Sequence, residues 1–214
     1  MADAGPIRVV GLGGSLHATS NSLAALRLAL EGAAEAGGET EALDIRELDL
    51  PFYQPDAPDV PPSVERLCTA VAGAQGMLWS SPLYHGTISG AFKNALDWLQ
   101  LLSDRDPPYL TDMVVGLIST AGGTQGLQAV NTMEFVVRAL RGWAVPLVIP
   151  VPKAWQAFDR EGHVRDRALE EQLRALGREV ARAAKQFAAG PPLTTAGAAA
   201  AEAALQPLGD EGVA

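Results

Sequence analysis

The chain has 214 residues, an apolar fraction of 48% and a formal net charge of −9. This length suits one α/β domain of about 190 residues with a short tail, and the negative charge argues against nucleic acid or an anionic membrane surface as a partner. Cys68 is the single cysteine, which excludes an intrachain disulfide and favours a reducing compartment. Because the first residues carry no leader pattern and no stretch reaches the roughly 20 apolar residues of a membrane span, we expect a cytoplasmic protein.

Short apolar runs alternate with helical patterns along the chain. We expect strands over residues 7–12, 40–45, 76–81, 113–119 and 143–151. The first helix is expected to be capped by Ser20 or Ser22 and to end at Gly37. Further helices are expected over residues 63–74, 90–102, 126–141 and 167–188. Strands that alternate with helices form right-handed crossovers, so the sheet is predicted to be parallel.

Two segments are predicted to lie outside these elements. Residues 50–62 contain five prolines and are expected to form a loop, after which Ser63 caps the next helix. From Gly190 the sequence is rich in alanine and lacks large apolar side chains, so it can bury little surface. We therefore expect one domain over residues 1–189 and a flexible tail over residues 190–214.

A glycine-rich turn, residues 13–22, follows the first strand and opens the first helix. Its hydroxyl groups come from Ser15, Thr19, Ser20 and Ser22. Free N–H groups and the helix dipole favour an anion at such a helix start, although a cluster of capping residues without a ligand explains the pattern equally well. The turn is not a dinucleotide G-x-G-x-x-G motif, because Leu16 takes the third glycine's place. His17 either donates to a phosphate or is a solvated loop residue.

The segment from Ser81 to Leu99 is a tight turn between a strand and an amphipathic helix. Tyr84 at the tip can stack on a flat ring system. On the helix, Lys93 and Asp97 have the spacing of a surface ion pair. The helix also carries an apolar stripe, which core packing or a subunit interface would explain: Phe92, Ala95, Leu96, Leu99 and Leu102.

A third loop, residues 119–126, follows the fourth strand and offers small residues and free amides. Such amides can stabilise a negative charge that develops on a bound ring. Since the carboxyl ends of parallel strands meet at one edge of a sheet, the three loops describe one ligand site there.

These motifs together resemble the NADPH-dependent FMN reductase family, which includes flavin, quinone, azo-dye and chromate reductases. The resemblance rests on Gly14-Ser15-Leu16 with Ser20, on the turn over residues 81–86 that runs into residues 90–98, and on Gly122-Gly123. It covers residues 7–188 and implies a flavodoxin-like three-layer α/β/α sandwich with a five-stranded parallel sheet in the order 2-1-3-4-5. The family's first loop holds the FMN phosphate, the second lies along the flavin ring, and the third meets its other edge.

The resemblance implies a set of cofactor-binding residues: Ser15, His17, Ser20, Ser22, Pro82, Leu83, Tyr84, His85, Gly86, Ser119, Ala121, Gly122 and Gly123. No metal ligand and no catalytic side chain are expected. The chain departs from the family at His17, where Arg is usual, and at Leu83 and His85, where many members have Glu and Asn. FMN binding survives these changes if the contacts come from the backbone.

The expected function is an NAD(P)H-dependent FMN oxidoreductase that passes hydride from the nicotinamide to FMN and on to free flavin or a small acceptor. FMN is expected rather than FAD, with Tyr84 in contact with the ring and His85 on the acceptor side. The alternatives are a quinone or azo reductase that retains FMN, a flavodoxin-like electron carrier, and a scaffold that binds partners through the apolar stripe. That stripe and the family resemblance also predict a homodimer or homotetramer.

Overall fold

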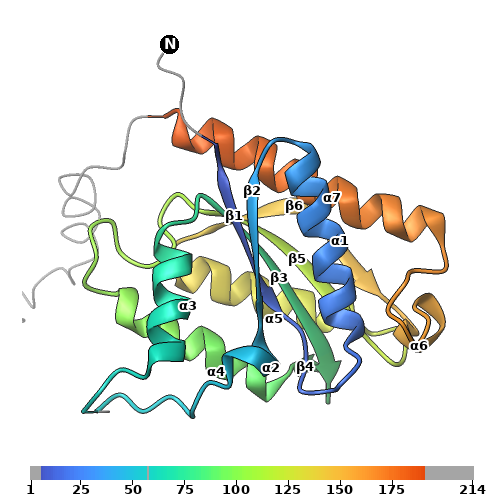
Figure 1. Ribbon diagram of the computed structural model, residues 1–214, viewed down its shortest axis with the longest axis horizontal. Helices are drawn as coiled ribbons and strands as arrows, with labels where there is room; N and C mark the ends of the chain where they lie inside the picture. Colours follow the sequence, from blue (N-terminus) through green and yellow to red (C-terminus); the bar gives the residue numbers. More distant parts are fainter. Residues whose placement is uncertain (1–5, 57, 191–214) are drawn as a thin grey trace, which may run out of the picture.

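The computed structural model describes residues 6–56 and 58–190 (Figure 1). The first half of the chain forms β1 (Arg8–Gly13), α1 (Asn21–Glu35), β2 (Glu39–Asp44), α2 (Ile45–Leu48), α3 (Pro62–Ala72), β3 (Gly76–Tyr84), β4 (Thr87–Ile88), α4 (Gly90–Trp98) and the 3₁₀ helix η1 (Leu99–Leu102). The second half forms β5 (Val114–Thr120), α5 (Leu127–Ala139), β6 (Trp143–Val151), α6 (Ala154–Ala157) and α7 (Arg167–Ala188).

The long strands form one parallel sheet in the order β2-β1-β3-β5-β6. Counted without the short β4, this is the flavodoxin-like order 2-1-3-4-5, which confirms the sequence prediction. β4 pairs antiparallel with the end of β3 and was not predicted. The chain leaves β1 toward β2 on one side and later returns to place β3 on the other, so the loops after β1 and β3 border a topological switch point.

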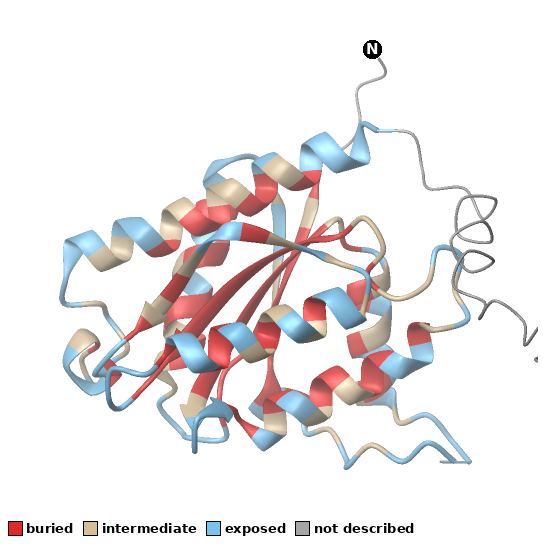
Figure 2. Ribbon diagram, turned by 180° about the vertical axis from the view of Figure 1, so that it is seen from behind, coloured by how far each residue is buried: buried red, intermediate tan, exposed pale blue. Residues whose placement is uncertain are grey.

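Helices cover both faces of this sheet (Figure 1). One apolar core contains α1 and α7, and the other contains α3, α4 and α5. All residues of β5 are buried, as expected for a parallel strand that is covered on both faces. Figure 2 shows the buried residues gathered in the sheet and on the inward sides of the helices.

The apolar stripe on α4 and η1 belongs to the core of the subunit. Phe92, Ala95 and Leu99 have no exposed surface, and Leu96 and Leu102 are almost fully buried. The subunit therefore covers this stripe itself, and the stripe is no argument for a dimer. The interface interpretation of the stripe was wrong because the helix is buried by α3 and the sheet rather than by a second copy.

The start of the second long helix differs from the prediction. Helix α3 begins at Pro62, and Pro61 is its N-cap without a side-chain hydrogen bond. The carbonyl of Pro61 accepts the N–H groups of Val64 and Glu65, so the Ser63 hydroxyl is not needed as a cap. Proline suits the first helical position because its φ angle is already helical and it lacks the N–H that would remain free there.

The predicted tail lies, apart from Gly190, outside the described residues. Within residues 6–56 and 58–190, the structure contains no helix with both the length and the apolar character of a membrane span.

Candidate functional site

Three loops follow β1, β3 and β5 at the carboxyl edge of the sheet. The strand register pairs Gly13 with Ser80 and Pro82 with Thr120, so the loops leave the sheet side by side. The backbone N–H of Gly14, which has a φ angle of 102°, donates to the Ser80 carbonyl at 3.2 Å. The first and second loops are thus joined at their bases.

The first loop is ordered by its own hydroxyl groups. Ser20 caps α1, and its side-chain oxygen accepts the N–H of Leu23 at 3.2 Å. The Ser15 hydroxyl donates to Ser20 at 3.1 Å and accepts the N–H of His17 at 3.3 Å. His17 and its neighbours up to Thr19 are exposed. A compact pair of hydroxyls therefore lies at the N-terminus of a 15-residue helix, which suits a phosphate.

Ser22 is placed differently from the other hydroxyls. It is 2% exposed, and its side chain forms a 2.6 Å hydrogen bond with the hydroxyl of Thr120 at the end of β5. Its carbonyl accepts a hydrogen bond from the Ser80 side chain at 2.8 Å. Ser22 therefore connects the first turn of α1 to β3 and β5 instead of facing the open part of the loop.

The second loop is a β-hairpin. Leu83 pairs with Ile88 and Tyr84 with Thr87, leaving a two-residue turn. Its residues, His85 and Gly86, have φ angles of 49° and 85°, the signs required by a type I′ turn. Tyr84 is 48% exposed beside this turn, whereas Pro82 is buried below it. The hairpin holds an aromatic face and several backbone amides at the edge of the sheet.

In the third loop, a buried stretch comes first and an exposed stretch follows it. Ser119 is buried and donates to the Gly126 carbonyl at 2.6 Å, and Ala121 is 2% exposed. Gly122 and Gly123 are exposed, and a Cβ atom at either one would meet nothing within 4 Å. Their φ angles also lie outside the left-handed region. The packing of the subunit does not require glycine here, and a flat ligand could approach the backbone closely.

The turn after β6 also belongs to this edge, although the sequence analysis did not select it. Ala121 donates to Val151 and accepts from Ala154, both at 2.9 Å, and Lys153 donates to Gly123 at the same distance. Lys153 has a left-handed φ angle of 45°. The available signal was the proline-containing turn at the end of the last strand, since that strand end shares the edge with the other loops.

A cavity of about 410 Å³ joins the first loop, the hairpin and the start of α4. Its walls are Ser15, Leu16, His17, Ala18, Tyr84, Ser89, Gly90 and Ala91. The structure therefore brings Ser15, His17 and Tyr84 together, while Ser22 and Ser119 are buried beneath the site. Sequence reasoning also missed the walls from α4, where Ser89 caps the helix and a Cβ atom at Gly90 would meet nothing within 4 Å.

The polar side chains further along α4 have structural partners. Asn94 donates to the Pro51 carbonyl at 2.9 Å and accepts the N–H of Tyr53 at 2.8 Å, and Trp98 donates to Pro51 at 2.8 Å. Lys93 and Asp97 form the expected surface ion pair at 2.5 Å. These residues fix the proline-rich segment rather than forming the site.

The geometry fits a flavin mononucleotide. The hydroxyls of Ser15 and Ser20 at the start of α1 suit one terminal phosphate, and the open backbone at Gly122 and Gly123 leaves room for the edge of a ring. The strand order and the placement of these loops define the class of flavodoxin-like flavoproteins.

The comparisons with known proteins are consistent with this class. A family model described as NADPH-dependent FMN reductase matches residues 7–156. The NADPH-dependent FMN reductase ArsH of Acidithiobacillus ferrooxidans is 34% identical over 64% of this chain, and the match spans 56% of that protein's length. An NADPH:quinone oxidoreductase of Arabidopsis thaliana is 31% identical over 78% of this chain and 87% of its own length. The chain belongs to the NADPH-dependent FMN reductase family.

A solved structure supports the fold. The flavoenzyme FerB, an NAD(P)H:(acceptor) oxidoreductase from Paracoccus denitrificans, superposes with a TM-score of 0.68 over 85% of this chain and 98% of FerB, at 24% identity. The family is described by an activity, the NADPH-dependent reduction of FMN.

Proposed function

We propose that this protein transfers hydride from NAD(P)H to a bound FMN and passes the electrons on to free flavin or another small acceptor. The observation that carries the proposal is the cavity that joins the Ser15 hydroxyl, which is hydrogen-bonded to Ser20 at the start of α1, to the half-exposed Tyr84 side chain. When bound, FMN supplies the ability to accept a hydride and to release electrons singly or in pairs.

The residues of the chain have binding and positioning roles in this proposal. Ser15, Ser20 and the first amides of α1 hold the phosphate, with His17 at the rim. The hairpin from Pro82 to Gly86, including Leu83 and His85, lies along the ring, and Tyr84 contacts it. Since hydride transfer to the ring needs no protein acid or base, no catalytic side chain is assigned.

The third loop holds the other edge of the ring through its backbone. Ala121, Gly122 and Gly123 contribute amides there, which favour negative charge on the ring. Ser119 and Ser22 are positioning residues, because their hydroxyls are directed to Gly126 and Thr120. They hold the third and first loops in place without touching the ligand.

Rapid mixing under anaerobic conditions tests the proposal. The FMN-loaded protein should lose its flavin absorbance quickly after NADPH or NADH is added. A flavodoxin-like carrier lacks a hydride donor site, so its flavin band would persist and the proposal would be wrong. Gly122→Leu, whose side chain would occupy the proposed position of the ring edge, should leave less of the protein loaded with FMN and so reduce the amplitude of the fast phase.

The second candidate is a quinone or azo-type reductase that retains FMN. The likeness to the plant quinone oxidoreductase favours it, and Tyr84, which lines the cavity, is 48% exposed. Steady-state NADPH oxidation with free FMN, a benzoquinone and an azo dye separates the candidates. Retention of FMN after gel filtration, with a quinone as the fastest acceptor, would favour this reading.

We also propose a homodimer or homotetramer that works in the cytoplasm. Support for assembly comes from the exposed apolar side chains on α5 and β6, of which Phe135 is 72% and Trp143 55% exposed. The single Cys68 is compatible with a reducing compartment. Light scattering at micromolar concentration, for the wild type and for Phe135→Lys, tests the assembly.

A further inference from the structure

A second cleft, of about 500 Å³, lies on the other side of the first loop. It is bounded by the first half of α1, the segment from Asp159 to Val164 and the first turns of α7. Ala18 lines both this cleft and the candidate flavin cavity, so the two hollows adjoin at the first loop. Its volume falls within the range of roughly 300–1,000 Å³ that is usual for small-molecule sites.

The outer wall of the cleft is well ordered. Phe158 and Val164 form an antiparallel bridge, and Phe158 is buried at 2% exposure. Within this turn, the Asp159 carboxylate accepts the N–H groups of Glu161 and His163 at 3.0 and 2.8 Å and contacts the His163 ring at 3.1 Å. The wall is therefore fixed by internal hydrogen bonds before any ligand arrives.

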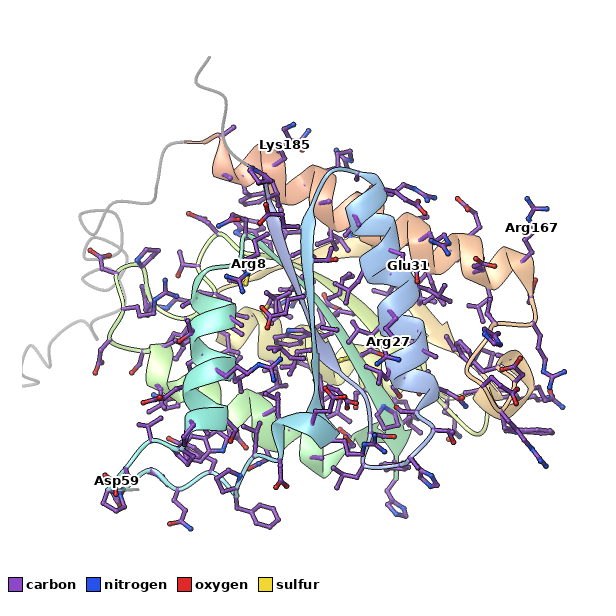
Figure 3. The ribbon with its side chains drawn as sticks, viewed as in Figure 1. Arg8, Arg27, Glu31, Asp59, Arg167 and Lys185 are labelled. Carbon is purple, nitrogen blue, oxygen red and sulfur yellow. The ribbon has the colours of Figure 1, made fainter. Side chains whose placement is uncertain are left out.

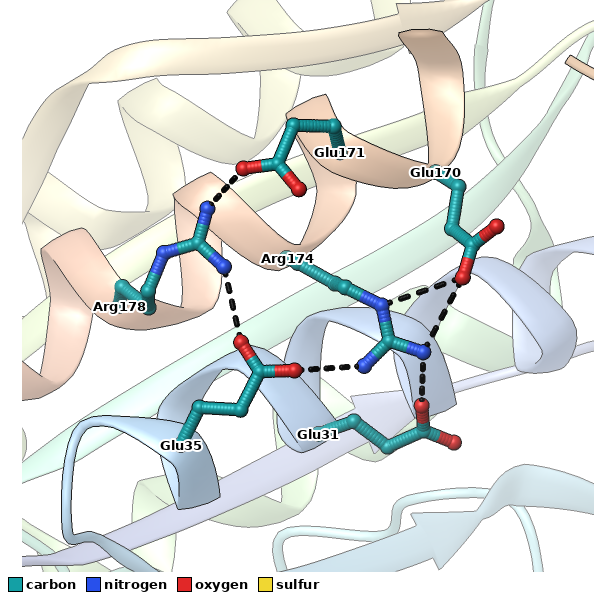
Figure 4. A network of polar contacts seen from close by, with 6 residues as sticks. All are labelled: Glu31, Glu35, Glu170, Glu171, Arg174 and Arg178. Carbon is teal, nitrogen blue, oxygen red and sulfur yellow. Dashed lines mark hydrogen bonds and ion pairs between the residues drawn. The ribbon is translucent and has the colours of Figure 1, made fainter. Parts of the chain in front are cut away.

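Three of the four carboxylates that line the cleft already have partners within the described residues. Glu31 and Glu170 both pair with Arg174, at 2.6 and 3.2 Å (Figure 4). The Asp159 carboxylate contacts the His163 ring. The charged lining residues that remain are Arg27, Arg160 and Glu161.

Arg27 and Arg160 are the free cations of the lining. Among the residues that the structure describes, neither of them forms an ion pair. Arg27 lies one helical turn before Glu31 on α1 (Figure 3), and both line the cleft. The lining as a whole carries three arginines, counting Arg174, against four carboxylates, so it has no overall excess of positive charge. An anionic ligand would meet the two unpaired guanidinium groups of Arg27 and Arg160.

We propose that this cleft binds the 2′-phosphorylated adenosine end of NADPH, with Arg27 and Arg160 as partners of the 2′-phosphate. The inference rests on the proposed function, because it places one end of the donor whose nicotinamide meets the flavin ring. A guanidinium group presents two parallel N–H donors to a phosphate and stays charged at every physiological pH. A dinucleotide extended from the flavin cavity passes the exposed first loop at Ala18 and enters the cleft.

The first experiment needs no turnover. The FMN-loaded full chain is titrated by calorimetry with 2′,5′-ADP and with 5′-AMP, which differ only in the 2′-phosphate. We expect 2′,5′-ADP to bind at least about ten-fold more tightly, and Arg27→Gln and Arg160→Gln each to remove about ten-fold of that advantage. Arg167→Gln is the matched control, because Arg167 lies at the outer end of α7 (Figure 3) and does not line the cleft.

The second experiment is kinetic. For both arginine variants we expect the KM for NADPH to rise about ten-fold, with unchanged kcat and unchanged KM for NADH. The inference would be overturned if the variants raised the KM for NADPH and for NADH equally, or if neither variant changed the affinity for 2′,5′-ADP.

The two experiments separate this inference from the proposed function. Arginine-dependent binding of 2′,5′-ADP in a protein that oxidises neither nucleotide would support the cleft and contradict the oxidoreductase. If NADPH is oxidised rapidly but 2′,5′-ADP binds no more tightly than 5′-AMP, the oxidoreductase is supported and the cleft proposal is contradicted.

Discussion

Ser22 and Thr120 lie 98 residues apart in the chain, and their hydroxyl groups share a 2.6 Å hydrogen bond in the interior. The Ser22 carbonyl also accepts a hydrogen bond from Ser80 at 2.8 Å. The start of α1 is thereby tied to the ends of β3 and β5, where the other two loops begin. The relative position of the three loops depends on these buried polar contacts, which are strong because no water competes for them.

Thr120→Val should lower the free energy of unfolding by about 1–2 kcal/mol, because it leaves the buried Ser22 hydroxyl without its partner. Ser22→Ala should have a similar effect, and the double variant should lose less than the sum of the two. Urea unfolding of the apoprotein measures this. Thr124→Val, at an exposed position of the third loop, is the control. Strictly additive losses would mean that the two hydroxyls do not interact.

Ser20→Ala should weaken FMN binding by about ten- to a hundred-fold, since a hydrogen bond to a charged phosphate contributes roughly 1.5–3 kcal/mol. The variant also loses the cap of α1, at a cost of about 1 kcal/mol. Asp166→Ala removes the side-chain cap of α7 and serves as the control for stability alone. Fluorescence titration should show weaker binding only for Ser20→Ala. If both variants bind FMN like the wild type, Ser20 is a helix cap and nothing more.

Gly122→Leu should reduce FMN affinity at least about ten-fold while leaving the melting temperature of the apoprotein within about 2 °C of the wild type. In the structure the space around Gly122 is open, so the side chain meets only solvent until a ligand arrives. Thr124→Leu, nearby and exposed, is the matched control. Unchanged FMN affinity in Gly122→Leu would show that the ring does not approach this loop.

Gly177→Ala should destabilise the protein by about 1–3 kcal/mol or more. A Cβ atom there would lie 1.7 Å from the carbonyl oxygen of Ala29, so α1 and α7 would have to move apart. Because alanine is otherwise the better helix former, by about 1 kcal/mol, the sign of the effect tests the helix contact. Thermal unfolding provides the measurement, and a stabilised variant would contradict the close packing of these helices.

The ion-pair network between α1 and α7 (Figure 4) should make the free energy of unfolding depend on pH in the acidic range. The hydrogen bond from Arg178, followed by that from Arg174, lowers the pKa of Glu35 below its ordinary value. A lowered carboxyl pKa adds stability above the pKa of the unfolded chain, about 4.3 for Glu, and this stability is lost as the pH falls through the folded value.

Glu35→Gln should therefore melt at a lower temperature than the wild type near about pH 7, and the difference should shrink below about pH 4 as the wild-type carboxyl becomes protonated. Calorimetric melting curves across this range measure the difference. Glu134→Gln breaks an isolated exposed pair with Arg138 and is expected to change little at either pH. A constant difference at all pH values would show that the ionised carboxylate is not the cause.

Local signals in the sequence predicted the strands, the three loops and the cap of α1, whereas the strand order followed from the family resemblance. The apolar run at residues 113–119 indicates a strand because it is short and bounded by turns, and the structure confirms β5 there. Ser20 was one of two candidate caps, and it is the one observed. The turn at Tyr84 was predicted, but the hairpin with β4 was missed, because His85 does not carry the usual sequence signal of a type I′ turn.

The sequence by itself thus determined the fold class and the positions of the loops, since hydrophobic period, glycine placement and capping act within a few residues of the chain. Only the tertiary structure decided which way the side chains of those loops face. Ser15 lines the cavity and Ser22 binds Thr120, although both are serines of one loop. In the same way, Phe92 is covered within the subunit, and Arg27 meets a cleft built by residues more than 130 positions away. The partner of a polar or apolar group is set by the packing of elements that are distant in sequence, which no local pattern records.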